Sequence, residues 1–84
     1  MDGELDRALA LVQYLRRHCP WDAAQTHRSL VPYLLEESHE TVDAIMADDA
    51  HGLEGELGDL LLNVAFQIVV GEEGGSLSRR GVVD

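Results

Sequence analysis

The chain has 84 residues and carries 16 acidic against 6 basic residues, which gives a formal net charge of −10. This length allows one small domain, and an apolar content of 45% argues against wholesale disorder. Proteins that bind nucleic acids or anionic membranes need basic residues to contact phosphates. The acidic balance of this chain and the lack of a basic stripe exclude both classes.

Cysteine usage and the N-terminal sequence indicate a cytoplasmic protein. Cys19 is the only cysteine, so no intrachain disulfide is possible. The chain does not open with a basic region followed by an apolar run, and no apolar stretch approaches the length that spans a membrane. We therefore expect a cytoplasmic, reduced protein without a membrane partner.

Apolar residues at three- and four-residue steps predict a first helix from about Glu4 to Arg17. The stripe consists of Leu5, Ala8, Leu9, Val12 and Leu15. Acidic residues from Asp2 onward open the segment and basic residues from Arg16 onward close it, an order that suits the helix dipole at both ends.

The next segment, Cys19-Pro20-Trp21-Asp22, interrupts this periodicity. Pro20 cannot continue a helix, so the segment is predicted to be a connection. Trp21 is the only tryptophan of the chain. A tryptophan in a connection either fills a gap in a small core, which is the commoner role, or stacks on a ligand base. Trp21 is therefore also a candidate substrate-binding residue.

The second helix is expected to begin between Thr26 and Ser29. Both residues can cap a helix, and Pro32 is tolerated only in a first turn. The helix should end near Ala47, ahead of an acidic turn. Its predicted apolar surface consists of Leu30, Leu34, Leu35, Val42 and Ile45.

The third helix is predicted from about Leu53 to Val70. Its wide apolar face consists of Leu57, Leu60, Leu61, Val64 and Ile68, and so broad a face indicates burial against more than one neighbour. Gly55 and Gly58 are unfavourable in a helix; they either permit a close helix approach or are neutral. We expect a helical domain over residues 1–70, followed by a glycine-rich linker and a short mobile tail over residues 71–84.

Two acidic clusters fall within the second and third predicted helices. They are Glu36-Glu37-Ser38-His39-Glu40 and Glu56-Leu57-Gly58-Asp59. Positions three or four apart share one face of a helix, so two antiparallel helices can bring both carboxylate lines face to face. Asn63 lies four residues after Asp59 and extends the second line. We add Asn63 to Trp21 as a candidate substrate-binding residue.

Carboxylates that sit among apolar residues repel one another and lose hydration, so something must compensate them. A divalent cation is the simplest compensator, and hard cations such as Mg²⁺ prefer oxygen ligands. The cysteine and histidine cluster that zinc prefers is missing from the sequence. Spacing alone leaves two interpretations open: a metal site, or glutamates that line a solvated helix face.

Three segments of the chain resemble the MazG-type nucleotide pyrophosphohydrolases. They read Cys-Pro-Trp-Asp-Ala-Ala-Gln-Thr-His-Arg-Ser-Leu at residues 19–30, Tyr-Leu-Leu-Glu-Glu-Ser-His-Glu at 33–40 and Gly-Glu-Leu-Gly-Asp-Leu-Leu-Leu at 55–62. The last two match the family's metal-binding pattern, E-E-x-x-E followed by E-x-x-D. The resemblance covers roughly residues 5–70.

This resemblance implies an all-α fold: a MazG-like helical bundle that becomes four-helix-bundle-like by dimerisation, as a homodimer or a dimer of dimers. It implies hydrolysis of nucleoside triphosphates to the monophosphate and pyrophosphate with Mg²⁺, for which Mn²⁺ can substitute. The implied metal ligands are Glu37, Glu40, Glu56 and Asp59. Glu36 is implied to position or deprotonate the attacking water.

Two alternatives stay open. Members of the family usually continue into a further helix with a basic stretch, which these 84 residues do not contain; Arg79 or Arg80 could substitute for it. A chain without that stretch could be a catalytically weak metal- or nucleotide-binding regulatory module. The other alternative is a helical dimerisation domain whose acidic residues are only surface. Neither the base nor the sugar of a substrate is specified by the sequence.

Overall fold

The computed structural model describes residues 3–84, and within that range the regular secondary structure is entirely helical. The helices are α1 (Glu4–His18), α2 (Pro20–Ala23), α3 (Val31–Met46), α4 (Ala50–Gly74) and α5 (Arg79–Val83). The predicted all-α fold class is confirmed. Asp2, which was expected to help open the first helix, lies outside the described residues.

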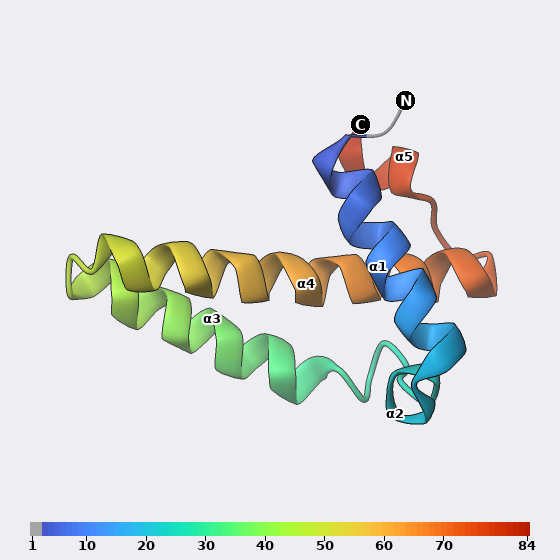
Figure 1. The fold of residues 1–84 in the computed structure, drawn as a ribbon, viewed down its shortest axis with the longest axis horizontal. Coiled ribbons are helices and arrows are strands. Elements are labelled where there is room, and N and C mark those ends of the chain that lie inside the picture. The colour runs from blue at the N-terminus through green and yellow to red at the C-terminus, as the bar shows by residue number, and fades with distance from the viewer. Residues whose placement is uncertain (1–2) are drawn as a thin grey trace.

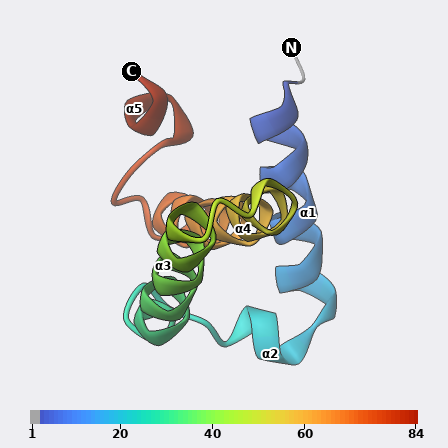
Figure 2. The same cartoon turned by 90° about the vertical axis from the view of Figure 1, so that its left-hand side faces the viewer.

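Helix α4 is the axis on which the other helices are arranged. Helix α3 returns antiparallel along its N-terminal half, whereas α1 crosses its C-terminal half on another side (Figures 1 and 2). Helix α2 continues from the end of α1, and α5 is linked to α1 by the ion pair of Arg79 with Asp6 (3.2 Å). We call α1, α2 and residues 63–74 of α4 the closed region, and α3 with residues 50–62 of α4 the open region.

The hydrophobic core lies mainly in the closed region, where α1 crosses α4, and Leu30 at the start of α3 completes it. Its buried members are Leu9, Val12, Leu30, Ala65, Phe66, Ile68 and Val69. Leu5 and Ala8 pack against this cluster. The apolar stripe predicted for the first helix is therefore confirmed except for Leu15, which is half-buried outside the cluster. Burial of this stripe is what holds a short helix in place, because an isolated helix of this length is marginal in water.

The open region exposes most of the apolar surface predicted for the second and third helices. Exposed fractions lie between 47% and 59% for Leu35, Val42, Ile45, Leu57 and Leu61. The broad burial that we expected for this face is not provided by the described part of the chain. A Cβ added at Gly55 or Gly58 would meet no neighbouring side chain or helix within 4 Å, so neither glycine serves a close approach between α3 and α4.

Two helix starts differ from the expectation. Thr26 and Ser29 do not cap α3; instead the Thr26 N–H donates to Ser29 Oγ (2.7 Å) and the Ser29 N–H donates to Thr26 Oγ1 (3.1 Å). This reciprocal pair forms a separate turn, and α3 begins only at Val31. Helix α4 begins at Ala50, earlier than expected, because the Asp49 carboxylate caps it by accepting from the Gly52 N–H (2.9 Å).

The C-terminal residues also differ from the expectation. Helix α4 continues past Val70 and stops at Gly74, followed by Gly75 at φ 74°, a conformation that glycine adopts without steric cost. Residues 79–83 form α5, whose Arg79 binds Glu72 and Asp6. The division into a domain over residues 1–70 and a tail over 71–84 stays a proposal.

The connection after α1 contains a single helical turn, α2, with Pro20 in its first turn. Proline is tolerated there because its missing N–H would have no partner within the helix.

Over residues 3–84, none of the helices combines the length and the apolar character needed to cross a bilayer.

Candidate metal centre and aromatic pocket

The turn between α3 and α4 places the two acidic clusters opposite each other. Asp48 adopts a positive φ of 55° and Asp49 caps α4, so the chain reverses within a few residues. Glu37 and Glu40 of α3 thereby face Glu56 of α4 across a groove. The antiparallel arrangement expected from the sequence is what the structure shows.

Three of the predicted metal ligands converge in this groove. Glu37, Glu56 and Asp59 each offer one carboxylate oxygen, and these oxygens all lie within 4.8 Å of one another. Glu37 and Glu56 are half-buried, whereas Asp59 is exposed. We call these three residues the carboxylate trio. Oxygen donors at this spacing suit a hard divalent cation.

Two oxygens of the trio are buried without a hydrogen-bond donor. They are Glu37 Oε1 and Glu56 Oε2, and no other buried side-chain oxygen or nitrogen of residues 3–84 lacks a partner. A carboxylate oxygen shielded from water and without a donor carries a large desolvation cost. A solvated acidic face would not show this feature, so the geometry favours a bound cation over that interpretation.

The pKa values of these carboxyls are displaced upward. The pKa of Glu37 is raised, first because its carboxylate is shielded from water and further by the charges of Glu40 and Asp59. The pKa of Glu40 is raised by its contact with the Glu56 carboxyl. That contact by itself lowers the pKa of Glu56, but burial and the neighbouring Glu37 outweigh it and the net shift is upward. A bound cation would act in the opposite direction, because positive charge stabilises the ionised carboxylates.

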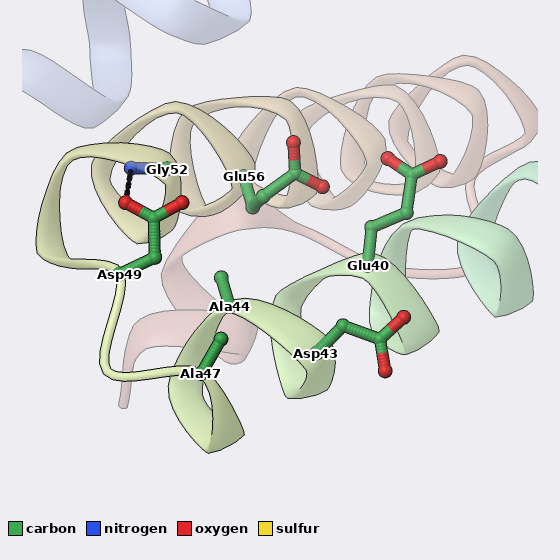
Figure 3. A pocket seen from close by; sticks show the side chains of 7 residues that line it. All are labelled: Glu40, Asp43, Ala44, Ala47, Asp49, Gly52 and Glu56. Carbon is green, nitrogen blue, oxygen red and sulfur yellow. Dashed lines mark hydrogen bonds between the residues drawn. The ribbon is translucent and has the colours of Figure 1, made fainter.

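Glu40 lies next to the trio but is not one of its converging members. Its exposed side chain extends from α3 toward α4, on the side where Glu56 projects (Figure 3). Both residues line a cavity of about 400 Å³, together with Asp43, Asp49 and Gly52. The structure thus places Glu40 within reach of the groove, at its edge.

Glu36, the predicted catalytic residue, is exposed on α3 and lies outside the trio. It is near enough to Glu40 for its charge to contribute to the raised pKa of that residue. The structure therefore brings Glu37, Glu56 and Asp59 together, sets Glu40 beside them and leaves Glu36 on the solvent side.

Trp21 does not fill the core, so the commoner of its two predicted roles was wrong. Its side chain is 52% exposed and its ring meets Tyr33 edge to face, with centroids 5.7 Å apart and an interplanar angle of 84°. The physical reason is that α2 lies at the outer end of α1, whereas the core is closed by Leu30 and Phe66.

A second cavity, of about 230 Å³, lies beside Trp21. Its lining, which we call the aromatic pocket, consists of Leu15, Trp21, Asp22, Leu30, Tyr33, Leu62, Asn63 and Phe66. Both predicted substrate-binding residues, Trp21 and Asn63, are therefore in one pocket. The Asn63 amide donates to the Asp59 carbonyl oxygen (3.1 Å).

The aromatic pocket and the carboxylate trio draw residues from the same two helices, α3 and α4. Tyr33 precedes Glu37 by one helical turn on α3, and Asn63 follows Asp59 by one turn on α4. Sequence reasoning missed Tyr33 as a pocket residue. Its spacing of four from Glu37 was the signal that could have identified it, because residues at that spacing share a helix face.

Comparison with known proteins identifies the family of the chain. Residues 25–84 match the family model described as "MazG nucleotide pyrophosphohydrolase domain". A protein of Escherichia coli strain K12 named "Nucleoside triphosphate pyrophosphohydrolase" is 45% identical over 76 residues, which cover 87% of this chain and 29% of that protein.

Relatives from other bacteria show similar likeness. A protein of the same name from Mycolicibacterium smegmatis is 47% identical over 66 residues, covering 79% of this chain and 20% of the relative. A protein from Thermotoga maritima, named "Nucleoside triphosphate pyrophosphohydrolase/pyrophosphatase MazG", is 42% identical over 65 residues. These residues cover 77% of this chain and 26% of the relative. The chain thus spans less than a third of the length of these curated relatives.

Proposed function

The chain belongs to the MazG nucleotide pyrophosphohydrolase family, and from that premise we propose that it hydrolyses nucleoside triphosphates to the monophosphate and pyrophosphate. One observation carries the proposal: three carboxylates converge, and two of their buried oxygens have no donor. A cation would compensate the charge of these carboxylates, and it would also compensate the negative charge of a bound triphosphate.

We propose that Glu37, Glu40, Glu56 and Asp59 hold Mg²⁺, with Mn²⁺ as a substitute. The donor set fits, because all of the groups are carboxylates and both ions prefer oxygen. When bound, the ion supplies positive charge at the phosphate oxygens, which lowers their repulsion of an attacking nucleophile.

Glu36 is proposed to orient the attacking water and to accept its proton. Its exposed position beside Glu37 leaves room for a water on the solvent side of the groove. Water then forms a bond to the phosphorus nearest the sugar, and the bond to the departing pyrophosphate breaks. Loss of the proton to a carboxylate raises the nucleophilicity of the water oxygen.

The aromatic pocket is proposed to bind the nucleobase. The half-exposed rings of Trp21 and Tyr33 can stack on a base, and the Asn63 amide can hydrogen-bond to its edge. A cavity of about 230 Å³ is smaller than the roughly 300–1,000 Å³ that encloses a whole drug-sized ligand. It therefore suits one end of a nucleotide, with the triphosphate in the neighbouring groove.

We propose a second copy of this chain as the macromolecular partner, in a homodimer or a dimer of dimers. The apolar side chains exposed on the open region, such as Val42, Ile45 and Leu57, would be covered by it. A formal charge of −10 argues against a nucleic-acid partner. A cytoplasmic location accords with a nucleotide substrate and remains part of the proposal.

One observation favours the alternative of a weakly catalytic binding module. Arg79, which was considered as a replacement for the family's basic stretch, is held by Glu72 and Asp6 in the structure. A cation engaged in this way does not reach phosphates in the α3–α4 groove. The alternative predicts metal and nucleotide binding without turnover.

A panel of nucleoside triphosphates with Mg²⁺, read out as pyrophosphate release, tests the proposed function. We expect turnover of at least one triphosphate, and its loss in folded Glu40→Gln and Asp59→Asn variants. Release of pyrophosphate that persists in both variants would contradict the assignment. Binding of Mg²⁺ and triphosphate with no turnover in the unsubstituted chain would support the binding module instead.

A further inference from the structure

The guanidinium of Arg16 joins three elements of the closed region. Its Nε and Nη2 donate to the two carboxylate oxygens of Glu73, at 2.7 Å each. Its Nη1 donates to the carbonyl oxygens of Asp22 (2.8 Å) and Gln25 (3.1 Å). The Arg16 side chain is only 12% exposed. Four donor contacts from a shielded guanidinium give a well-defined geometry that a surface ion pair lacks.

The two carbonyls that Arg16 binds fix the turn that carries Trp21. They lie at the end of α2 and just after it, and the Asp22 carbonyl oxygen also accepts from the Gln25 N–H (3.3 Å). A cation at this end also suits the helix dipole. From the other side, the Gln25 side-chain amide donates to the Trp21 carbonyl oxygen (2.9 Å). The backbone around Trp21 is therefore held by polar contacts, although the ring itself is half exposed.

The other partner of Arg16 connects this turn to the helix of the metal site. Glu73 lies on α4, which also carries Glu56, Asp59 and Asn63. Through Arg16, the position of Trp21 is set relative to α4 as well as to α1. This matters for the aromatic pocket, because one wall comes from the Trp21 turn and another from α4.

We propose that Arg16, together with Glu73, is a positioning residue for substrate binding: it holds the α2 turn so that Trp21 stays over the aromatic pocket. The inference rests on the proposed function, since it assigns the pocket to a nucleobase. Arg16 touches neither the trio nor the pocket cavity, so its loss should weaken binding more than the chemical step. Lysine cannot replace it, because a single ammonium does not reach a carboxylate and two carbonyls in one plane.

The sole tryptophan allows the turn to be observed directly. Acrylamide quenching of Trp21 fluorescence is compared among the unsubstituted chain, Arg16→Lys, Arg16→Gln and Glu73→Gln. Arg17→Gln is the matched control, since Arg17 is exposed on the same helix. We expect quenching to increase about twofold in the Arg16 and Glu73 variants, because lost hydrogen bonds to a charged group loosen the turn. Arg17→Gln should leave it unchanged.

Steady-state kinetics use the fastest substrate of the triphosphate panel, and titration uses its non-hydrolysable α,β-methylene analogue with Mg²⁺. For Arg16→Lys we expect KM and the analogue Kd to rise about tenfold, with kcat within about threefold of the original value. Glu73→Gln provides the same test at a half-exposed position, should Arg16→Gln fail to fold.

Unchanged KM and Kd in folded Arg16→Lys and Glu73→Gln would overturn the positioning role while leaving the proposed function intact. A fall in kcat with no change in KM would overturn it too, because Arg16 would then affect the chemical step. If the unsubstituted chain binds no triphosphate, the proposed function fails, and the positioning role fails with it.

Discussion

The two halves of α4 carry similar side chains but differ in what surrounds them. Residues 63–74 bury Ala65, Phe66, Ile68 and Val69 against α1. Residues 50–62 leave Leu57 and Leu61 about half exposed. Their carboxylates form no ion pair with any residue of the range 3–84. One 25-residue helix thus serves as the core of the closed region and as one wall of the open groove.

The acidic residues show the contrast most clearly. In the closed region, Glu72 accepts hydrogen bonds from Arg79, which lowers the pKa of Glu72 and raises that of Arg79. In the open region, Glu37 and Glu56 face each other and lose water, which raises their pKa values. An arginine partner stabilises the ionised form, and a second carboxylate destabilises it. Carboxylates therefore face one another in the open region, whereas Glu72 of the closed region is paired with an arginine.

The largest expected effect concerns packing. Leu9→Ala in the closed region should cost about 2–5 kcal/mol of unfolding free energy, because it leaves a cavity in a fully buried site. Its matched control, Leu61→Ala in the open region, should cost about 1 kcal/mol or less in the dilute chain, since Leu61 is 47% exposed. Urea denaturation measures both.

Equal costs for the two leucine substitutions in the dilute chain would contradict the division into closed and open regions. A cost for Leu61→Ala that grows with protein concentration would instead show that a second copy covers the open region.

The next effect concerns the cation. Mg²⁺ at about 100 times its dissociation constant should add about 2.7 kcal/mol of stability, because it binds only the folded chain. Glu56→Gln should remove most of that gain and should stabilise the metal-free chain, since it removes one of the repelling charges. Thermal melting with and without Mg²⁺ measures this, with Glu54→Gln, an exposed neighbour outside the trio, as control. A gain retained in Glu56→Gln would argue against the trio.

The two regions should respond to pH in opposite directions without metal. The pKa of Glu72 is lowered by folding, so its stabilising contribution is present above its ordinary value of 4.5 and is lost as the pH falls through the lowered value. The pKa of Glu37 is raised, so its contribution is present below 4.5 and is lost as the pH rises through the raised value.

Melting temperatures between pH 3 and about pH 7 test this. Glu72→Gln should remove part of the stability loss that occurs as the pH falls, worth about 1 kcal/mol or less for a partly exposed pair. Glu37→Gln should reduce the stability loss that occurs as the pH rises toward neutrality. Identical pH profiles for the two variants would show that the environments do not differ as described.

The smallest expected effect compares two glycines of α4. Gly58→Ala in the open region should stabilise the isolated chain by about 0.5–1 kcal/mol, because alanine is the better helix former and nothing lies within 4 Å of the added Cβ. Gly71→Ala should destabilise it, since the added Cβ would clash with the Leu77 side chain. Thermal melting of both variants measures the difference. A destabilising Gly58→Ala would indicate that another surface approaches that position.

Sequence periodicity predicted the helices because burial and periodicity coincide in α1, where Leu9 and Val12 are both apolar and enclosed. It was less reliable at the helix ends. Thr26 and Ser29 satisfy each other instead of capping α3, and Asp49 starts α4 early. Such choices depend on side-chain hydrogen bonds that compete with the helix, and composition does not reveal which bond forms.

The candidate site was predictable to the extent that it depends on helical spacing. Glu37, Glu56 and Asp59 converge because three- and four-residue steps keep them on facing sides. The exposure of Trp21 and the engagement of Arg16 with Glu73 were not predictable, because both depend on how the α2 turn packs against helices distant in sequence. Contacts between such distant segments leave no periodic signal.

The central claim is that Glu37, Glu56 and Asp59 bind a divalent cation. A crystal grown with Mn²⁺ tests it most directly, by anomalous scattering recorded near the manganese edge. We predict a strong peak within about 2–2.5 Å of an oxygen from each of the three carboxylates, as oxygen ligands of such ions require. A map with no peak between α3 and α4, or with these carboxylates turned apart toward solvent, would contradict the account.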